Sequence, residues 1–282
     1  MGNVKMRLAV IAAGFLSMIW GFQALIFNHA PGVFNAKEED MSFGWYVPLF
    51  SIYVIWAERK KIAESFGAPS FLGLLLMLPC LALGFLGARG LQVRFEIVAF
   101  SGLIVSFVWA VMGWRTAKTV MFPALFLLFC IPLATFLDVV TVHLRLLASG
   151  TAYGILHGVG ADVVRQGTMI SAIDGSFAID VAEPCSGLRS IFALMALTAA
   201  YSYLTQKTWA GKILLFALSV PIAVLGNVAR ILTICMVGTW ASGDFATGFY
   251  HDYSGYVVFV VAIALMVAAG EAISKLFGRG RK

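Results

Sequence analysis

Long apolar segments separated by short clusters of charge run through this 282-residue chain. A helix needs about 20 mostly apolar residues to cross the hydrocarbon core of a bilayer. The pattern predicts an all-α polytopic membrane protein that forms a single integral membrane domain over residues 1–282. About eight spans are expected, at residues 8–27, 43–57, 71–88, 97–114, 119–137, 187–205, 213–240 and 254–273.

Two of these spans have features of their own. The first follows Lys5 and Arg7 like a signal peptide, but its apolar stretch is too long and no small-x-small cleavage site follows. We therefore expect a retained anchor. The seventh span contains Pro221 and Gly226, which predict a kink.

The longest stretch between spans covers residues 138–184. An amphipathic run at 139–147 is expected to extend the fifth helix along the interface, and a Gly-rich patch follows it. Asp174-Gly175 is a type I′ turn signal, which predicts a β-hairpin just before the sixth span. Polar and apolar residues alternate from Ser176 onward, so one face of this segment should be buried. That face consists of Phe177, Ile179 and Val181. The hairpin is either a plain surface feature or a platform for an extended peptide.

The amino-acid composition also indicates a membrane protein. The chain is 61% hydrophobic and 12% charged, with a mean hydropathy of +0.91, whereas soluble domains are nearer 45–50% apolar and about 25% charged. Too few polar residues are present to cover such a chain in water, so lipid must surround most of it. The net charge of +6 lies in short clusters between apolar runs, which indicates membrane topology and not nucleic-acid binding.

The basic residues also predict an orientation. Cytoplasmic segments are enriched in Lys and Arg. With the N-terminus inside and eight spans, thirteen of the twenty Lys and Arg residues fall in inner segments, five in outer segments and two within spans. We expect a multi-pass protein of a bacterial-type inner membrane with both termini in the cytoplasm.

Four cysteines are present, and they differ in their surroundings. Cys80, Cys130 and Cys235 lie inside apolar runs, where cysteine behaves as a small hydrophobe. No CxxC motif and no Cys/His cluster with zinc-ligand spacing occurs. We therefore expect neither a metal nor another cofactor.

Cys185 is the exception, because it stands in the polar sequence Glu183-Pro-Cys-Ser-Gly-Leu-Arg-Ser190 at the start of the sixth span. Pro184 favours a helix start. The unpaired N–H groups and positive dipole of a helix N-terminus stabilise a thiolate. Arg189 is one turn further along on the same face, and its charge adds to this effect. These features predict a reactive cysteine, against the alternative of a buried inert one.

Arg230 lies within the seventh span, in Gly226-Asn227-Val-Ala-Arg230. A charge within a span costs at least about 2.5 kcal/mol, so it should face the protein interior or a wet cavity. Asn227, one turn earlier, is placed to hold the guanidinium. Arg230 would then stabilise an oxyanion or bind a substrate carboxylate. The alternative is a structural ion pair with Glu183 or Asp252.

His251 lies at the outer entry to the last span, in Phe249-Tyr-His-Asp-Tyr-Ser-Gly-Tyr256. Histidine transfers protons near neutral pH, and the expected topology puts His251 on the same membrane face as Cys185. Asp252 or a backbone carbonyl would orient its ring. Cys185, Arg230 and His251 together supply a nucleophile, a cationic clamp and a proton-transfer group.

These residues resemble those of the exosortase/archaeosortase family of membrane transpeptidase-like enzymes. The resemblance rests on Cys185-Ser-Gly-Leu-Arg-Ser190, Asn227-Val-Ala-Arg230 and His251-Asp-Tyr-Ser-Gly255, and covers about residues 119–273. It implies a Cys185/Arg230/His251 triad, and an acyl-enzyme formed by attack of Cys185 on a peptide carbonyl. It also implies exported protein substrates that end in a Pro-Glu-Pro-like motif, a transmembrane helix and a basic tail. The acceptor is left open among water, an amine, a lipid and a glycan.

Two other classes compete with this interpretation. A multi-pass transporter would use Arg189, Arg230 and the region of Pro221 to line a path, but no inverted repeat is visible in the sequence. A different membrane acyltransferase or intramembrane protease would also place a nucleophile at a helix end. No GxSG serine with a partnering histidine, HExxH or DHHC motif is found.

Overall fold

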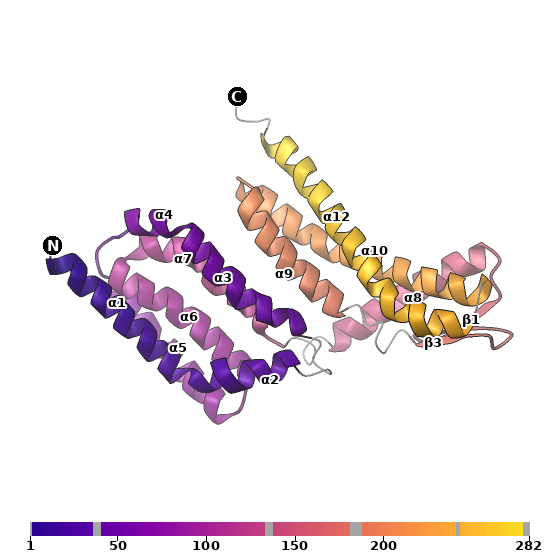
Figure 1. The fold of residues 1–282 in the computed structure, drawn as a ribbon, viewed down its shortest axis with the longest axis horizontal. Helices are drawn as coiled ribbons and strands as arrows, with labels where there is room; N and C mark the ends of the chain where they lie inside the picture. The colour runs from indigo at the N-terminus through magenta and orange to yellow at the C-terminus, as the bar shows by residue number, and fades with distance from the viewer. Residues whose placement is uncertain (1, 36–40, 133–137, 181–187, 241–242, 279–282) are drawn as a thin grey trace. The chain divides into compact units, whose positions relative to one another are not determined.

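The computed structural model describes residues 2–35, 41–132, 138–180, 188–240 and 243–278 (Figure 1). The chain divides into two compact units, Met1–Leu133 and Ala134–Lys282. The expectation of a single domain over residues 1–282 stays a prediction.

All secondary-structure elements in the described part of the first unit are helical. Its elements are α1 (Gly2–Gly21), the π-helical turn η1 (Leu25–His29), α2 (Ala30–Asn35), the 3-10 turn η2 (Ser42–Trp45), α3 (Tyr46–Ala57), α4 (Arg59–Glu64), α5 (Phe71–Arg89), α6 (Val93–Met112), α7 (Trp114–Phe126) and the 3-10 turn η3 (Leu127–Cys130).

Small residues bring α5 and α6 close together. A Cβ at Gly73 would overlap the backbone of Ala110, and a Cβ at Gly102 would lie 2.7 Å from the Sγ of Cys80. Close backbone approach at small residues is a usual way for membrane helices to pack, since lipid provides no hydrophobic force between them. The opposite side of α5 is exposed, with Leu78 and Phe85 each 61% accessible.

The second unit combines helices with a small sheet. Its elements are α8 (Asp138–Gly158), β1 (Val163–Gln166), β2 (Met169–Ala172), β3 (Ala178–Asp180), α9 (Leu188–Thr205), α10 (Trp209–Trp240), α11 (Gly243–Phe245), the π-helical turn η5 (Ala246–Tyr250) and α12 (His251–Gly278). The three strands are antiparallel in the order β1-β2-β3.

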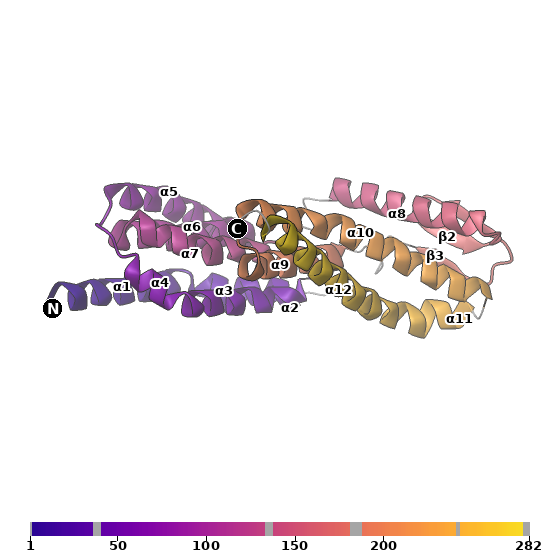
Figure 2. The same cartoon turned by 90° about the horizontal axis from the view of Figure 1, so that it is seen from above.

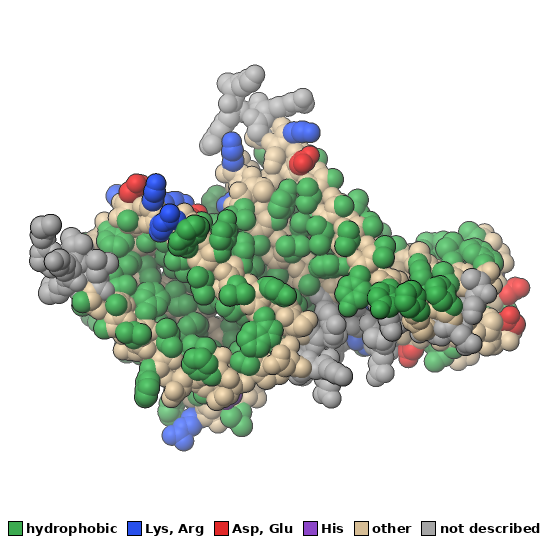
Figure 3. Space-filling model, in the orientation of Figure 1, with side chains coloured by type: hydrophobic (Ala, Val, Ile, Leu, Met, Phe, Trp, Pro, Cys, Tyr) green, Lys and Arg blue, Asp and Glu red, His purple; other side chains and the backbone are tan. Residues whose placement is uncertain are grey.

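The described residues do not support as many as eight spans. Among the described residues, four helices are long and apolar enough to cross a membrane, and a fifth span is possible if two helices bent by 57°, Ala9–Gly21 and Leu25–Asn35, count as one. These four are Phe71–Arg89, Val93–Met112, Trp209–Trp240 and Gly248–Phe277. Exposed apolar side chains cover much of the visible face of both units (Figure 3), as expected for a protein in lipid.

The remaining predicted spans differ from the structure for local reasons. The described parts of the helices Ser42–Ala57 and Ser190–Thr205 are apolar but shorter than a span requires, and residues 181–187 before the second one lie outside the described residues. The segment predicted at 119–137 is not one helix, because α7 ends at Phe126 and Ile131 has an extended backbone. The seventh span is longer than predicted, and α10 stays helical through Pro221.

The segment before the cysteine motif is more structured than the sequence indicated. Its first part is the 21-residue helix α8, which includes Gly150, Gly154 and Gly158 of the predicted Gly-rich patch. In place of a simple hairpin the segment forms a three-stranded sheet, in which β2 pairs with both β1 and β3. Gly167, at φ +64°, begins the two-residue turn between β1 and β2, as a type II′ turn requires.

The turn at Asp174-Gly175 is not of type I′. That type needs a positive φ at both central residues, and Gly175 has one (+77°) whereas Asp174 does not. Instead the Asp174 carboxylate accepts a hydrogen bond from the backbone N–H of Ser176 at 2.9 Å. This bond holds the pKa of Asp174 below its ordinary value. The predicted alternation is confirmed, because Phe177 and Ile179 are buried and their neighbours are exposed; Val181 lies outside the described residues.

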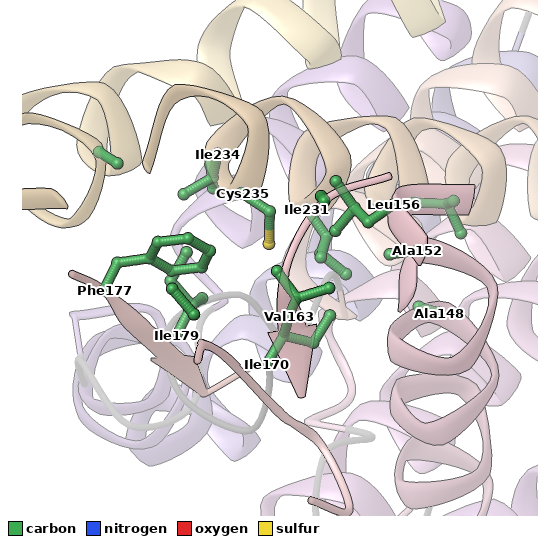
Figure 4. Close-up of a cluster of buried hydrophobic side chains, with 14 residues drawn as sticks. Ala148, Ala152, Leu156, Val163, Ile170, Phe177, Ile179, Ile231, Ile234 and Cys235 are labelled. Carbon is green, nitrogen blue, oxygen red and sulfur yellow. The ribbon is translucent and has the colours of Figure 1, made fainter. Parts of the chain in front are cut away.

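The buried face of the sheet packs on α8 and on the C-terminal part of α10. Figure 4 shows Val163, Ile170, Phe177 and Ile179 of this segment gathered around Cys235. Figure 2 shows α8 and the strands beside the end of α10 that leads to α11. A second cluster joins α9, α10 and α12 through buried residues that include Leu194, Leu215 and Met266. The candidate site lies among these three helices.

Candidate functional site

A small pocket opens between α9, α10 and α12. About 20 Å³ within it can hold the centres of water molecules, which is room for about one water. Its lining on α10 runs from Ala223 to Arg230 and on α12 from Gly255 to Ala262, about two turns of each helix. The lining residues are Ser190, Leu194, Ala223, Gly226, Asn227, Arg230, Gly255, Val258, Phe259 and Ala262.

Arg230 crosses from α10 to α12. Its side chain is half-buried, and Nε donates a hydrogen bond to the hydroxyl oxygen of Ser254 at 3.2 Å. Ser254 is 4% exposed, so the serine end of this bond is shielded from solvent. The prediction that Arg230 faces the protein interior is consistent with this position.

Gly255 lies directly beneath the guanidinium. A Cβ at this position would be 3.3 Å from Cζ of Arg230 and 3.5 Å from both Nη1 and Nη2. Nearly equal distances to these three atoms place that point over the centre of the guanidinium plane. The flat face of the guanidinium therefore lies against the backbone of α12, and the glycine makes this approach possible.

The two helices also approach closely one turn earlier on α10. A Cβ at Gly226 would lie 3.2 Å from Cγ1 of Val258. Asn227, the next residue, lines the pocket as Arg230 does. A bond between Asn227 and the guanidinium stays a prediction.

The other predicted site residues are placed less completely. Cys185 and Glu183 lie outside the described residues, and so do the side chains of Arg189, His251 and Asp252. The backbone shows that Arg189 belongs to α9 and that His251 is the first residue of α12.

Helical spacing relates His251 to the described part of the site. Residues three and four apart lie on the same face of a helix. His251 therefore shares a face with Ser254 and Gly255, the residues that contact Arg230. On α9, Ser190 lines the pocket and follows Cys185 by five residues in the sequence. Residues from all three predicted motifs thus meet at one pocket, while convergence of the thiol and the imidazole there stays a prediction.

Sequence reasoning assigned no role to Ser190, Ser254 or Gly255, although all three stand within the quoted motifs. The spacing of Ser254 and Gly255 from His251 was the signal that could have identified them. A contact between α10 and α12 cannot be read from either segment alone.

The sheet packs against α10, the helix that carries Arg230, at a point outside the pocket. Phe177 contacts Gly238 of α10, where a Cβ would lie 2.7 Å from its Cδ1. Gly238 is eight residues after Arg230, about 12 Å along the helix.

In the part of the chain that the structure describes, no three His, Cys, Asp or Glu side chains gather to form a metal site.

Comparison with known proteins adds one finding. Residues 35–268 match a family model described as transmembrane exosortase. No curated protein and no solved structure matched the chain. The family match spans most of the chain and includes all three motifs at the pocket.

Proposed function

The chain belongs to the transmembrane exosortase family, and we propose that it is a membrane-embedded cysteine transpeptidase or protease that cleaves C-terminal sorting signals of exported proteins. The observation that carries this proposal is the pocket at which residues from all three motifs meet. Ser190 is the last residue of the motif that begins at Cys185, Arg230 is the last residue of the second motif, and Gly255 is the last residue of the motif that begins at His251.

The position of the pocket along the helices suits a site at a membrane surface. On α10, Arg230 follows Trp209 by 21 residues, about 32 Å. On α12, Ser254 precedes Lys275 by the same number. Trp and Lys favour the interface, and the hydrocarbon core is about 30 Å thick. If Trp209 and Lys275 mark one surface, Arg230 and Ser254 lie near the other.

Orientation follows from charge. Cytoplasmic ends of spans carry the excess of Lys and Arg, and the end of α12 opposite Ser254 leads into Lys275, Arg279, Arg281 and Lys282. The pocket would then open to the outer face of the inner membrane, with the C-terminus in the cytoplasm. A substrate that crosses the membrane in the same region would present its peptide bond at this level.

The chemistry uses three side chains. The thiolate of Cys185 attacks the carbonyl carbon of the scissile peptide, and the carbonyl oxygen becomes an oxyanion stabilised by hydrogen bonds from Arg230. The C–N bond then breaks as protonated His251 gives its proton to the leaving amine. A thioester between Cys185 and the new C-terminus remains. His251 takes a proton from the incoming acceptor, whose attack releases the thiolate.

Charge also bears on recognition. Arg189 would attract an acidic residue of the sorting signal, and the implied Pro-Glu-Pro-like motif supplies one. Asn227 would support Arg230, and Glu183 or Asp252 would orient neighbouring groups. Water, an amine, a lipid or a glycan each fits the acceptor step.

The test is processing of a reporter in cells. A secreted reporter that ends in a Pro-Glu-Pro motif, a transmembrane helix and an Arg-rich tail is co-expressed with the protein, and cleavage is followed by a shift in mass. Cys185→Ser should abolish cleavage while the protein remains in the membrane, whereas the matched variant Cys80→Ala should cleave normally. Cleavage that persists with Cys185→Ser would refute the proposal, and a transporter would behave in that way.

A further inference from the structure

We propose that Ser254 and Gly255 are positioning residues that fix the orientation of the Arg230 guanidinium relative to His251. This inference rests on the proposed function, because it assigns Arg230 a reaction to serve. Ser254 holds one edge of the guanidinium, and Gly255 supports its face.

The hydroxyl of Ser254 fixes the edge. A serine buried in a helix commonly bonds a carbonyl of its own helix, as Ser202 does with Ala199 at 3.0 Å and Ser219 with Phe216 at 2.6 Å. Ser254 is equally buried, and its oxygen accepts a bond from a different helix, at Nε of Arg230. A hydrogen bond to a charged group is stronger than one between neutral groups. It restrains rotation of the side chain about its last bonds.

The missing side chain of Gly255 fixes the plane. The guanidinium lies flat over the position that a Cβ would take, at 3.3 Å from Cζ. A real Cβ there would force the guanidinium away by a few tenths of an ångström. One hydrogen bond leaves the plane able to tilt, and the backbone of α12 on one face limits that tilt.

This arrangement directs the two terminal nitrogens. A guanidinium has five N–H donors in a rigid fork. The bond to Ser254 uses the N–H on Nε and neither of the NH₂ groups. Because the plane and one edge are held by α12, the directions of both NH₂ groups are set by the same element. A guanidinium plane held in this way has a fixed orientation for the paired bonds by which Arg recognises an oxyanion or a carboxylate.

The same turn of α12 carries the proton-transfer group. His251 precedes Ser254 by three residues and Gly255 by four, so all three share a face of the helix. A shift of α12 would move the imidazole and the guanidinium together. The first turn of α12 would therefore set the geometry of both groups that act on the scissile bond, and small errors in such geometry are costly to rates.

The test measures rates with the full-length protein in detergent and a synthetic peptide that carries the Pro-Glu-Pro motif between a fluorophore and a quencher. Ser254→Ala and Gly255→Ala should each lower kcat about tenfold, with KM changed less than about twofold. Two matched controls should stay within about twofold of the wild type. Ser202→Ala removes an equally buried hydroxyl, and Gly154→Ala adds a Cβ where nothing lies within 4 Å.

A positioning role is distinguished from a merely structural one by measuring the fraction of correctly folded enzyme in each preparation. Each kcat is divided by the fraction of protein whose Cys185 reacts with a thiol reagent, read by mass spectrometry of the Cys185 peptide. A tenfold loss that survives this correction supports positioning. The proposal is overturned if either variant has a corrected kcat within twofold of the wild type, or if Ser202→Ala and Gly154→Ala lose as much.

The failure of this inference is distinguishable from that of the proposed function. Cys185→Ser is measured in the same assay. If it cleaves at the wild-type rate, the proposed function fails. If it is inactive while Ser254→Ala and Gly255→Ala cleave at full rate, only the positioning proposal fails.

Discussion

The ring of Phe177, at the end of the loop before β3, lies so close to Gly238 of α10 that a Cβ there would come within 2.7 Å of its Cδ1. Phe177 is 4% exposed and belongs to the core that joins the sheet, α8 and α10. A Cβ at Gly243 would likewise overlap the carbonyl oxygen of Ser176. The turn before β3 is thus fitted against the end of the helix that carries Arg230.

Gly238→Ala tests this fit. The added methyl must displace the ring of Phe177, and overpacking of a close contact typically costs about 1–3 kcal/mol. We expect a lower free energy of unfolding, measured by thermal or denaturant unfolding in detergent. Gly154→Ala, with open space around it in α8, should be neutral or slightly stabilising, since Ala is the better helix former. Equal free energies of unfolding for the two variants would show that Phe177 can move away from α10 without a loss of stability, contrary to this prediction.

Arg230→Lys should impair peptide cleavage about 100-fold, the loss found when one donor to an oxyanion is removed. A lysine keeps the charge but has neither Nε–H for Ser254 nor a planar fork. The measurement is kcat/KM for the quenched peptide. Arg165→Lys is the control, because Arg165 bonds the carbonyl oxygens of Gly167 and Leu146 outside the pocket. Unaltered cleavage by the Arg230→Lys variant would remove Arg230 from the mechanism.

His251→Gln should lower turnover by about 10²–10⁴, the usual contribution of a general acid or base. Glutamine keeps hydrogen-bonding capacity but does not carry the proton. The rate of peptide cleavage is compared with that of His157→Gln, which changes an exposed histidine of α8. Full activity of the His251→Gln variant, at unchanged thermal stability, would dismiss His251 as the proton-transfer group.

Cys185 should be labelled from outside the cell. A membrane-impermeant thiol reagent is added to intact spheroplasts that express a variant in which Cys80, Cys130 and Cys235 are replaced by alanine. We expect rapid modification, because the proposed site faces the outer surface and the helix start favours the thiolate. The control is the same variant with Cys185→Ala, which should remain unlabelled. Modification only after the cytoplasmic side is exposed would contradict the topology.

His29, which is half-buried, pairs with the buried carboxylate of Glu96 in the first unit. Nδ1 of His29 lies 2.9 Å from one carboxylate oxygen of Glu96, which is 2% exposed, at the bend between α1 and α2. His29→Leu should destabilise the protein by about 1–3 kcal/mol, since a buried acceptor loses its donor. Unfolding in detergent measures the change. The double variant His29→Leu, Glu96→Leu should recover part of the loss, and a further loss instead would show that Glu96 has a larger role than bonding His29.

Much of the architecture can be predicted from short segments of the sequence taken one at a time. Apolar length identifies α5, α6, α10 and α12 as helices that could cross a membrane, because transfer of a helix into lipid depends on the sum of its own residues. Strand alternation identifies the buried side chains of Phe177 and Ile179, because successive side chains of a strand point to opposite faces. The three motifs mark the helices that form the pocket, and they predict Arg230 and Asn227 in it.

Tertiary structure decided what depends on two segments at once. Strand β1 exists because β2 supplies its hydrogen bonds, so its four residues carry little signal alone. Hydropathy summed across 119–137 missed the end of α7 at Phe126. The bond between Arg230 and Ser254 joins residues 24 apart in the sequence. Gly255 has its role only because a guanidinium from another helix lies against it. Hydropathy adds up residue by residue along one helix, whereas a contact between helices depends on the side chains of both.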